Sequence, residues 1–300
     1  MLVYHYARVS ALDKAGDIKF RILTYYIADL PFRDHRETME RPFFSLSKRK
    51  RLRPIDYQSP DGRVWIKVSP HGEHGMATIW DADILIWATS QILERCRRGE
   101  PMQRVIAFRP NELLRAIGRV YNASGCAGGK SYVELKAALD RLKNTNIRTN
   151  IRVLNGNRLR RDEGSFSWID EWRYVEAEGE APLMEFELSR WVYEGILQRG
   201  GVLAIDPAYF SIDGGLERAL YRIARKHAGL QGAFRIHLDT LHEKAGSDAS
   251  LREFRRMLKG IAERNTMPGY CITYDRDGDA VTFTARDVQG SVGETPIQPA

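Results

Sequence analysis

The stretch Gly129–Arg161 reads GKSYVELKAALDRLKNTNIRTNIRVLNGNRLRR. Its apolar residues recur three and four positions apart, which predicts a helix from Lys130 to about Asn144. Residues 145–154 then alternate as a strand, and the following NGN predicts a hairpin turn. Residues 141–161 hold seven Arg and Lys and no acid. A helix pair with a basic hairpin directly behind it indicates a winged helix, that is, a helix-turn-helix with an attached β-hairpin.

The segments before this stretch supply the other elements of such a domain. RVWIKVSP (63–70) alternates as a strand, and ILIWATSQILERCRR reads as a helix that Asp81 or Asp83 caps and Gly99 ends. A short strand, MQRVIAF, follows, and then a helix that Asn111 caps and Gly118 ends. The order is therefore strand, helix, short strand, helix, helix and hairpin.

An internal repeat extends this pattern to the second half of the chain. RPNELLRAIG (109–118) aligns with HLDTLHEKAG (237–246), and SYVELKAALDRL (131–142) aligns with SLREFRRMLKGI (250–261). The pairs include the candidate helix caps Asn111 and Asp239, and the helix-ending Gly118 and Gly246. A hairpin signal with a DG turn, YCITYDRDGDAVTFTAR, follows the second copy. The sequence therefore predicts an α+β chain of two tandem winged-helix domains.

Shifts in composition suggest where these domains begin and end. Residues 1–40 show no sustained period and are expected to form an N-terminal extension that docks loosely. EAEGEAPLMEFE is acidic and contains Gly and Pro, which indicates a boundary. The predicted divisions are an extension (1–40), a first winged-helix domain (41–177), an acidic linker (178–187), a second winged-helix domain (188–286) and a disordered tail (287–300).

Charge and cysteine content narrow the class of protein. The 300 residues carry a net charge of +7, which favours a polyanionic partner such as nucleic acid. Three cysteines, far apart and in no metal-ligand spacing, indicate a reducing compartment without a disulfide framework. No apolar run approaches the roughly 18 residues of a membrane span, and the N-terminus lacks a signal core. We expect a cytoplasmic protein that needs no membrane, cofactor or metal.

Helical geometry separates core positions from candidate DNA contacts. In the first basic helix Tyr132, Leu135, Leu139 and Leu142 point inward, and in its repeat Leu251, Phe254, Leu258 and Ile261 do so. The outward faces suit the major groove, and the basic hairpin suits flanking phosphates or the minor groove. The arm RPFFSLSKRKRLRP (41–54) is either a surface segment pinned by Phe43 and Phe44 or a basic arm on phosphates, and both can hold. The DNA-binding candidates are Lys48, Arg49, Lys50, Arg51, Lys130, Ser131, Val133, Glu134, Ala137, Arg141, Arg148, Arg152, Arg158, Arg160, Arg161, Arg252, Arg256 and Lys259.

Four of these segments also carry a family resemblance. MERPFFSLSKRKR, ATIWDADILIWATSQI, FRPNELLRAIGR and GKSYVELKAALDRLKNTNIRT occur in this order, and with them residues 26–286 resemble the plasmid replication initiator protein A family. The resemblance implies an initiator that binds repeated sequences at a plasmid origin, helps to open the duplex and loads host replication proteins such as the host initiator and helicase. It also implies tandem winged helices and a switch between monomers, which initiate, and homodimers, which repress.

Motifs for catalysis are weak. A rolling-circle nickase needs a metal-binding His-hydrophobe-His pair and a nucleophilic tyrosine, whereas His71 and His74 have the wrong spacing. Gly129-Lys130-Ser131 ends like a phosphate loop, but Ser124 stands where the first glycine should be. We therefore expect no enzyme. A winged-helix transcriptional regulator remains the alternative, and an RNA-binding protein is disfavoured because no stacking platform of strand aromatics is evident.

Overall fold

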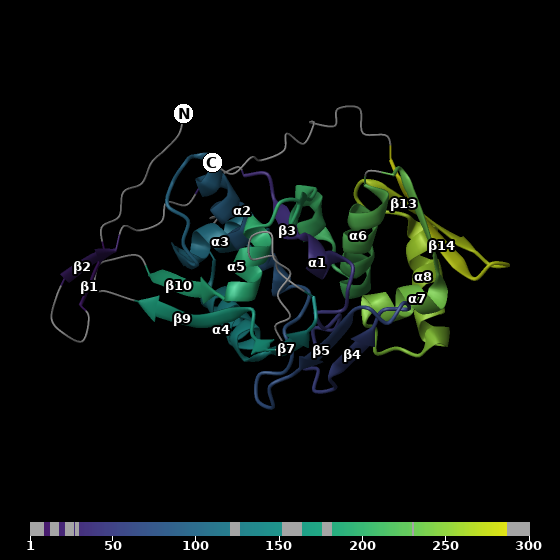
Figure 1. Ribbon diagram of the computed structural model, residues 1–300, viewed down its shortest axis with the longest axis horizontal. Coiled ribbons are helices and arrows are strands. Elements are labelled where there is room, and N and C mark those ends of the chain that lie inside the picture. Colours follow the sequence, from purple (N-terminus) through teal and green to yellow (C-terminus); the bar gives the residue numbers. More distant parts are fainter. Residues whose placement is uncertain are drawn as a thin grey trace.

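The computed structural model describes residues 9–12, 18–21, 27, 30–120, 127–151, 164–175, 182–229 and 231–286. Figure 1 shows two lobes, one that includes α2 to α5 and one formed by α6 and the elements after it, with β3 and α1 between them. The expected mixture of helices and sheets is confirmed. No helix within the described residues is long and apolar enough to cross a bilayer.

The first lobe combines helices α2 to α5 with a three-stranded antiparallel sheet. Buried apolar residues from its helices and strands form one continuous core. The sheet order is β6-β10-β9, so the last strand of the lobe lies in the middle. Its elements are α2 (Ala82–Arg97), β6 (Val105–Phe108), α3 (Pro110–Ala116), α4 (Gly129–Asn144), β9 (Ile169–Val175), β10 (Leu183–Leu188) and α5 (Arg190–Leu197).

The second lobe repeats this order of elements. Its sheet has the order β12-β14-β13, which again places the last strand in the middle. Gly118 after α3 and Gly246 after α7 are both left-handed, with φ of 70° and 67°, so both predicted helix ends are confirmed. The elements are α6 (Gly215–Ala228), β12 (Ala233–His237), α7 (Leu238–Ala245), α8 (Leu251–Arg264), β13 (Tyr270–Asp275) and β14 (Ala280–Ala285).

A second sheet in the first lobe changes the place of the basic segment. β7 (Asn146–Thr149), directly after α4, pairs with β5 (Trp65–Ser69) and β8 (Ser165–Phe166) in a sheet of order β4-β5-β7-β8, with β4 at Ile55–Gln58. The strands that correspond to β13 and β14 are instead β9 and β10. The predicted hairpin is confirmed in part, because β7 pairs antiparallel with β8 in the returning SFS stretch. Its predicted equivalence to the hairpin of the second lobe is wrong, because β9 and β10 hold that position. Alternation could not reveal this, because it shows which residues form a strand and not which strand pairs with it.

The predicted acidic linker contains strand β10. Met184, Phe186 and Leu188 are buried, while Glu185 and Glu187 alternate with them. Glu187 pairs with Arg104 at 2.5 Å, which places its charge at the sheet surface. Acidic composition therefore marked the outward side of a central strand, and Leu183–Leu188 belongs to the first lobe.

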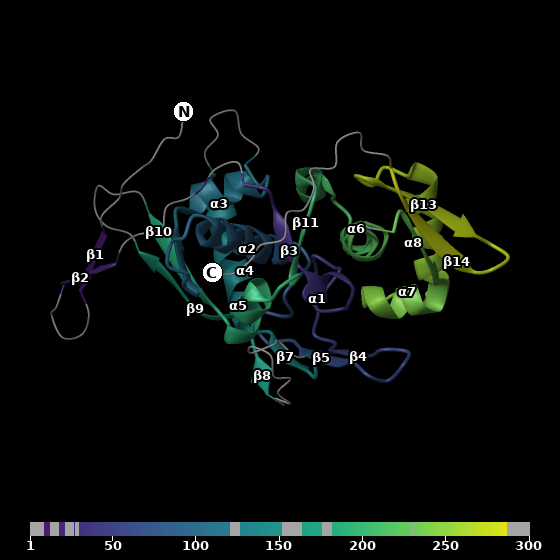
Figure 2. The ribbon, with the colours of Figure 1, turned by 45° about the horizontal axis from the view of Figure 1, so that its top comes forward.

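The end of the N-terminal extension is part of the folded body. β3 (Arg33–His35) pairs with β11 (Val202–Ala204), and Figure 2 shows these two strands side by side between the lobes. α1 (Arg36–Met39) packs against α6. Asp34, His35 and Met39 are buried, so the expectation of loose docking is wrong for this segment. Its short length and mixed polarity gave no periodic signal.

Candidate nucleic-acid interface

The start of α4 stands in solvent. Lys130 is 90% exposed and Val133 66%, while Leu135, Leu139 and Leu142 are buried as predicted. Gly128 precedes the helix without a side-chain cap, and the first turn has no acid. This end of the helix therefore keeps its partial positive charge and its free backbone N–H groups. Lys130 Nζ lies 3.9 Å from Glu134, a surface pair that contributes little to stability.

Four further predicted residues of α4 lie in different settings. Glu134 is exposed, and Ser131 and Ala137 are half-buried. Arg141 instead donates to both carboxylate oxygens of Asp81, at 2.7 and 2.8 Å. Burial alone would lower the pKa of Arg141, but the hydrogen bonds and charge of Asp81 outweigh it and raise that pKa. Arg141 thus fastens α4 to the start of α2.

The basic arm is anchored at both ends and open in the middle. Phe43 and Phe44 are buried in the first core. Arg51, 8% exposed, donates to the carbonyl of Gly246 at 2.9 Å and pairs with Asp248 at 2.7 Å in the second lobe. Between these anchors Lys48, Arg49 and Lys50 are exposed, and Lys48 lies over the ring of Trp80. A groove of about 510 Å³ separates the arm from α8, lined by residues that include Arg51, Arg256 and Arg264.

Arg148 is the one predicted residue of the basic hairpin that the structure describes. It is exposed on β7, with Lys67 of β5 opposite it in register. Sequence reasoning missed Lys67, although the alternation of RVWIKVSP places it on the same outward side as Arg63 and Trp65. Lys67 also lies 3.4 Å from Asp56 on β4. Arg152, Arg158, Arg160 and Arg161 lie outside the described residues.

The outward face of α8 is basic but partly paired. Ser250 caps the helix by accepting from the Glu253 backbone N–H. Arg256 pairs with Glu253 at 2.6 Å, and Lys259 lies over the Tyr274 ring. Arg252 is exposed, and among the described side chains none pairs with it. The expectation that Leu251 points inward is wrong: it is 37% exposed, because it is the first residue of the helix and lies beyond the core.

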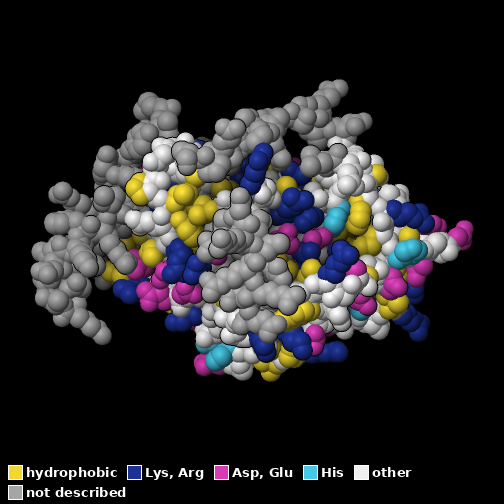
Figure 3. All heavy atoms as spheres, in the orientation of Figure 1, with side chains coloured by type: hydrophobic (Ala, Val, Ile, Leu, Met, Phe, Trp, Pro, Cys, Tyr) yellow, Lys and Arg dark blue, Asp and Glu magenta, His cyan; other side chains and the backbone are white. Residues whose placement is uncertain are grey.

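On the face that Figure 3 shows, basic side chains do not form one continuous patch. In Figure 3, Lys and Arg are interspersed with Asp and Glu over both lobes. His71 and His74 stack with ring centroids 5.0 Å apart, and His71 Nδ1 accepts from backbone N–H groups of its own turn. Across the described part of the chain, no group of three or more His, Cys, Asp or Glu side chains could hold a metal ion.

A family model and one relative name replication, and two solved structures are similar in fold. The model of the family described as replication initiator protein A matches residues 33–272. A relative from Wigglesworthia glossinidia brevipalpis, named "Putative replication protein", is 34% identical over 275 residues, which cover 89% of this chain and 94% of that one. Two crystal structures of domains 2 and 3 of RctB are similar in fold. The first has a TM-score of 0.54 and 16% identity, and the match covers 83% of this chain and 95% of the RctB chain. The second has a TM-score of 0.50 and 15% identity, and the match covers 82% of this chain and 95% of the RctB chain.

Proposed function

Because the chain belongs to the replication initiator protein A family, we propose that it is a cytoplasmic, sequence-specific duplex-DNA-binding initiator of plasmid replication. It binds repeated sites at the origin, promotes opening of the duplex and recruits host replication proteins such as the host initiator and helicase. It does so without catalysis of its own, and a homodimer forms its repressing state.

The observation that carries the proposal is the equivalent placement of α4 and α8. Each is the second helix of a pair, each follows a strand-and-helix unit of the same order, and each precedes a strand pair of the same sheet order. Each also buries one apolar face and leaves basic residues in solvent. We interpret each lobe as a winged helix, with α4 and α8 as the helices that enter successive major grooves.

The exposure of each side chain suggests which part of the DNA it contacts. At α4, Lys130, Val133 and Glu134 can reach base edges, and Val133 offers an apolar contact to a thymine methyl. At α8, Arg252 and the partly paired Arg256 serve in the same way. Backbone phosphates are contacted from the exposed strand side and arm, by Lys67, Arg148 and Lys48–Lys50, and by the predicted Arg152, Arg158, Arg160 and Arg161.

The testing experiment is selection of bound duplexes from a random DNA pool near 0.15 M salt, followed by footprinting on the enriched site. We expect one site of about two helical turns, protected in two successive major grooves. Binding that enriches no sequence and disappears with modest salt would contradict sequence-specific recognition.

A transcriptional regulator would enrich a site in the same selection. Support of replication separates the two: a plasmid that carries the selected repeats and this gene should replicate, and the same plasmid with scrambled repeats should not. Repression of a promoter without replication would favour the regulator.

A further inference from the structure

Helix α6 carries a row of three cations that face one acid of the first lobe and three acids of the β3–α1 segment, which lies between the lobes. Arg218, Arg222 and Lys226 are spaced four residues apart and therefore lie along one side of the helix. Their partners come from three elements: Asp83 from α2, Asp34 from β3, and Glu37 and Glu40 from the first turn and the C-cap of α1.

The middle pair is enclosed. Arg222 Nε donates to Asp34 at 2.6 Å, and its Nη2 donates to the other carboxylate oxygen at 3.0 Å and to the Thr38 hydroxyl at 2.8 Å. The side chains of Arg222 and Asp34 are each 4% exposed. This geometry is bidentate, so it fixes direction as well as distance.

The first pair is equally buried. Arg218 Nη1 donates to Asp83 at 2.7 Å, and its other nitrogens donate to the carbonyls of Ile212 and Phe210. Arg119, just after α3, donates to the second oxygen of Asp83 at 3.2 Å. The carboxylate of Asp83 on α2 thus contacts both α6 and the segment just after α3.

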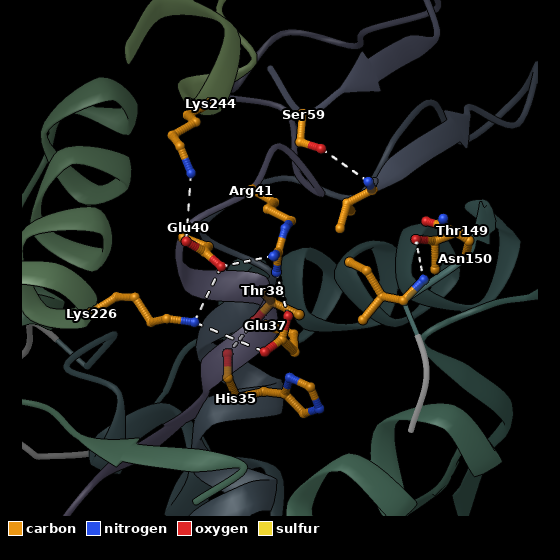
Figure 4. A network of polar contacts seen from close by, with 12 residues as sticks. His35, Glu37, Thr38, Glu40, Arg41, Ser59, Thr149, Asn150, Lys226 and Lys244 are labelled. Atoms are coloured by element: carbon orange, nitrogen blue, oxygen red, sulfur yellow. Dashed lines mark hydrogen bonds and ion pairs between the residues drawn. The ribbon is translucent and has the colours of Figure 1, made fainter. Parts of the chain in front are cut away.

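Glu40 is the hub of the third contact. Figure 4 shows it among Arg41, Lys226 and Lys244, with the two lysines approaching from the second lobe. Lys226 lies 3.2 Å away, Lys244 3.5 Å, and His227 Nε2 2.8 Å. Burial alone would raise the pKa of Glu40, but His227 and the surrounding cations outweigh it and hold that pKa far below its usual range.

We propose that this row locks the register between the two DNA-reading helices, so that Arg218, Arg222 and Lys226 are positioning residues that set the spacing of the two DNA segments. The proposal rests on the proposed function for its DNA consequence. Buried ion pairs add little net stability but favour one arrangement, because a shifted interface would leave a charge unpaired. The three contacts span the eight residue steps from Arg218 to Lys226, roughly 12 Å of helix. They therefore resist both sliding of α6 along its axis and rotation of α6 about that axis.

The first experiment measures the lock without DNA. Spin labels on Lys143→Cys in α4 and Glu263→Cys in α8, both exposed, report the distance between the lobes in a chain whose native Cys96, Cys126 and Cys271 are replaced by Ser. We expect a narrow distance distribution that broadens in Arg222→Gln. The matched control is Arg95→Gln, a buried arginine whose partner Glu100 lies in its own lobe. An equally narrow distribution in Arg222→Gln and the parent would overturn the lock.

The second experiment measures the consequence for DNA. The selected site is rebuilt with its two halves moved apart or together by one and two base pairs. The parent chain and Arg95→Gln should lose at least tenfold in affinity on every shifted site, whereas Arg222→Gln should bind them within about threefold of the original. Identical spacing profiles in all three would contradict the positioning role.

Two other outcomes have their own controls: a variant that does not fold, and failure of the proposed function. If Arg222→Gln does not fold, Lys226→Gln at the outer end of the row carries both tests. If the parent enriches no DNA sequence, the proposed function fails, and the label distances still decide whether α6 locks the lobes.

Discussion

At the scale of single residues, Gly195 shows how tightly the region between the lobes is packed. A Cβ placed on Gly195 would meet His35 Nε2 at 1.9 Å, and His35 is buried and stacked on Trp191. Gly195→Ala should lower the free energy of unfolding by about 1–3 kcal/mol through overpacking. Gly260→Ala in α8 meets only Arg264 at 3.5 Å and should instead stabilise by about 0.5–1 kcal/mol. Urea denaturation of both variants measures the difference, and equal effects would contradict it.

His35 also makes stability depend on pH. Burial lowers its pKa from 6.5 to about 4, against the raising effects of Asp34 and Glu37. The unfolded chain therefore binds a proton that the folded chain does not between these values. The contribution of neutral, buried His35 to the free energy of unfolding is complete above pH 6.5. It is lost as the pH falls, by about 1.4 kcal/mol per pH unit. His35→Leu should flatten the curve of unfolding free energy between pH 6.5 and 4.5 by one proton. The same slope in the variant would exclude His35 as the source.

At the scale of elements, the strand side and the start of α4 should behave differently toward DNA. Arg148→Ala and Lys67→Ala should weaken binding to all duplexes alike, and each should reduce the slope of log affinity against log salt by about one. Lys130→Ala should also change the preferred base at one position, by roughly 1–3 kcal/mol if its contact is bidentate. Salt titrations on the selected site and its single-base variants measure both, with the exposed Arg97→Ala as control. An unchanged slope for Arg148→Ala would remove β7 from the interface.

Helices and the glycines that end them could be predicted from the sequence because their signals are local, but the predicted caps Asn111 and Asp239 lie inside α3 and α7, whose N-caps are Arg109 and His237. The apolar faces of α4 and α8 and the left-handed Gly118 and Gly246 follow from spacing and residue type alone. The pairing of β7 with the returning strand β8 follows from the hairpin signal, whereas its second neighbour β5 could not be predicted, because alternation does not identify the neighbouring strand. Sequence alone does not distinguish the polar side of α6 from a solvated face, and only the tertiary structure shows that Arg218 and Arg222 are buried against acids. Arg141 was expected to face DNA for the same reason, whereas it is bound to Asp81.

At the scale of the whole molecule, the lobes should unfold together. Met39 of α1 and Ile86 of α2 enter the second core, and the charged row on α6 joins the same interface. Arg222→Gln leaves Asp34 buried without its partner and should cost about 3–5 kcal/mol. Arg222→Met combined with Asp34→Leu should cost less than the single change, because no unpaired charge remains. Calorimetry should show one transition in the parent and two in Arg222→Gln; one transition in every variant would contradict coupling through this pair.

The pairing of β3 with β11 has a consequence for synthesis on the ribosome. His35 emerges early, yet its partner Val202 follows about 170 residues later. At roughly 5–20 residues per second, β3 waits on the order of 10–30 s for its neighbour. During that interval an unpaired strand and the apolar side of α1 are open to other chains. β3 thus cannot pair before β11 has been made, and translation speed and chaperone supply should govern the yield of native protein.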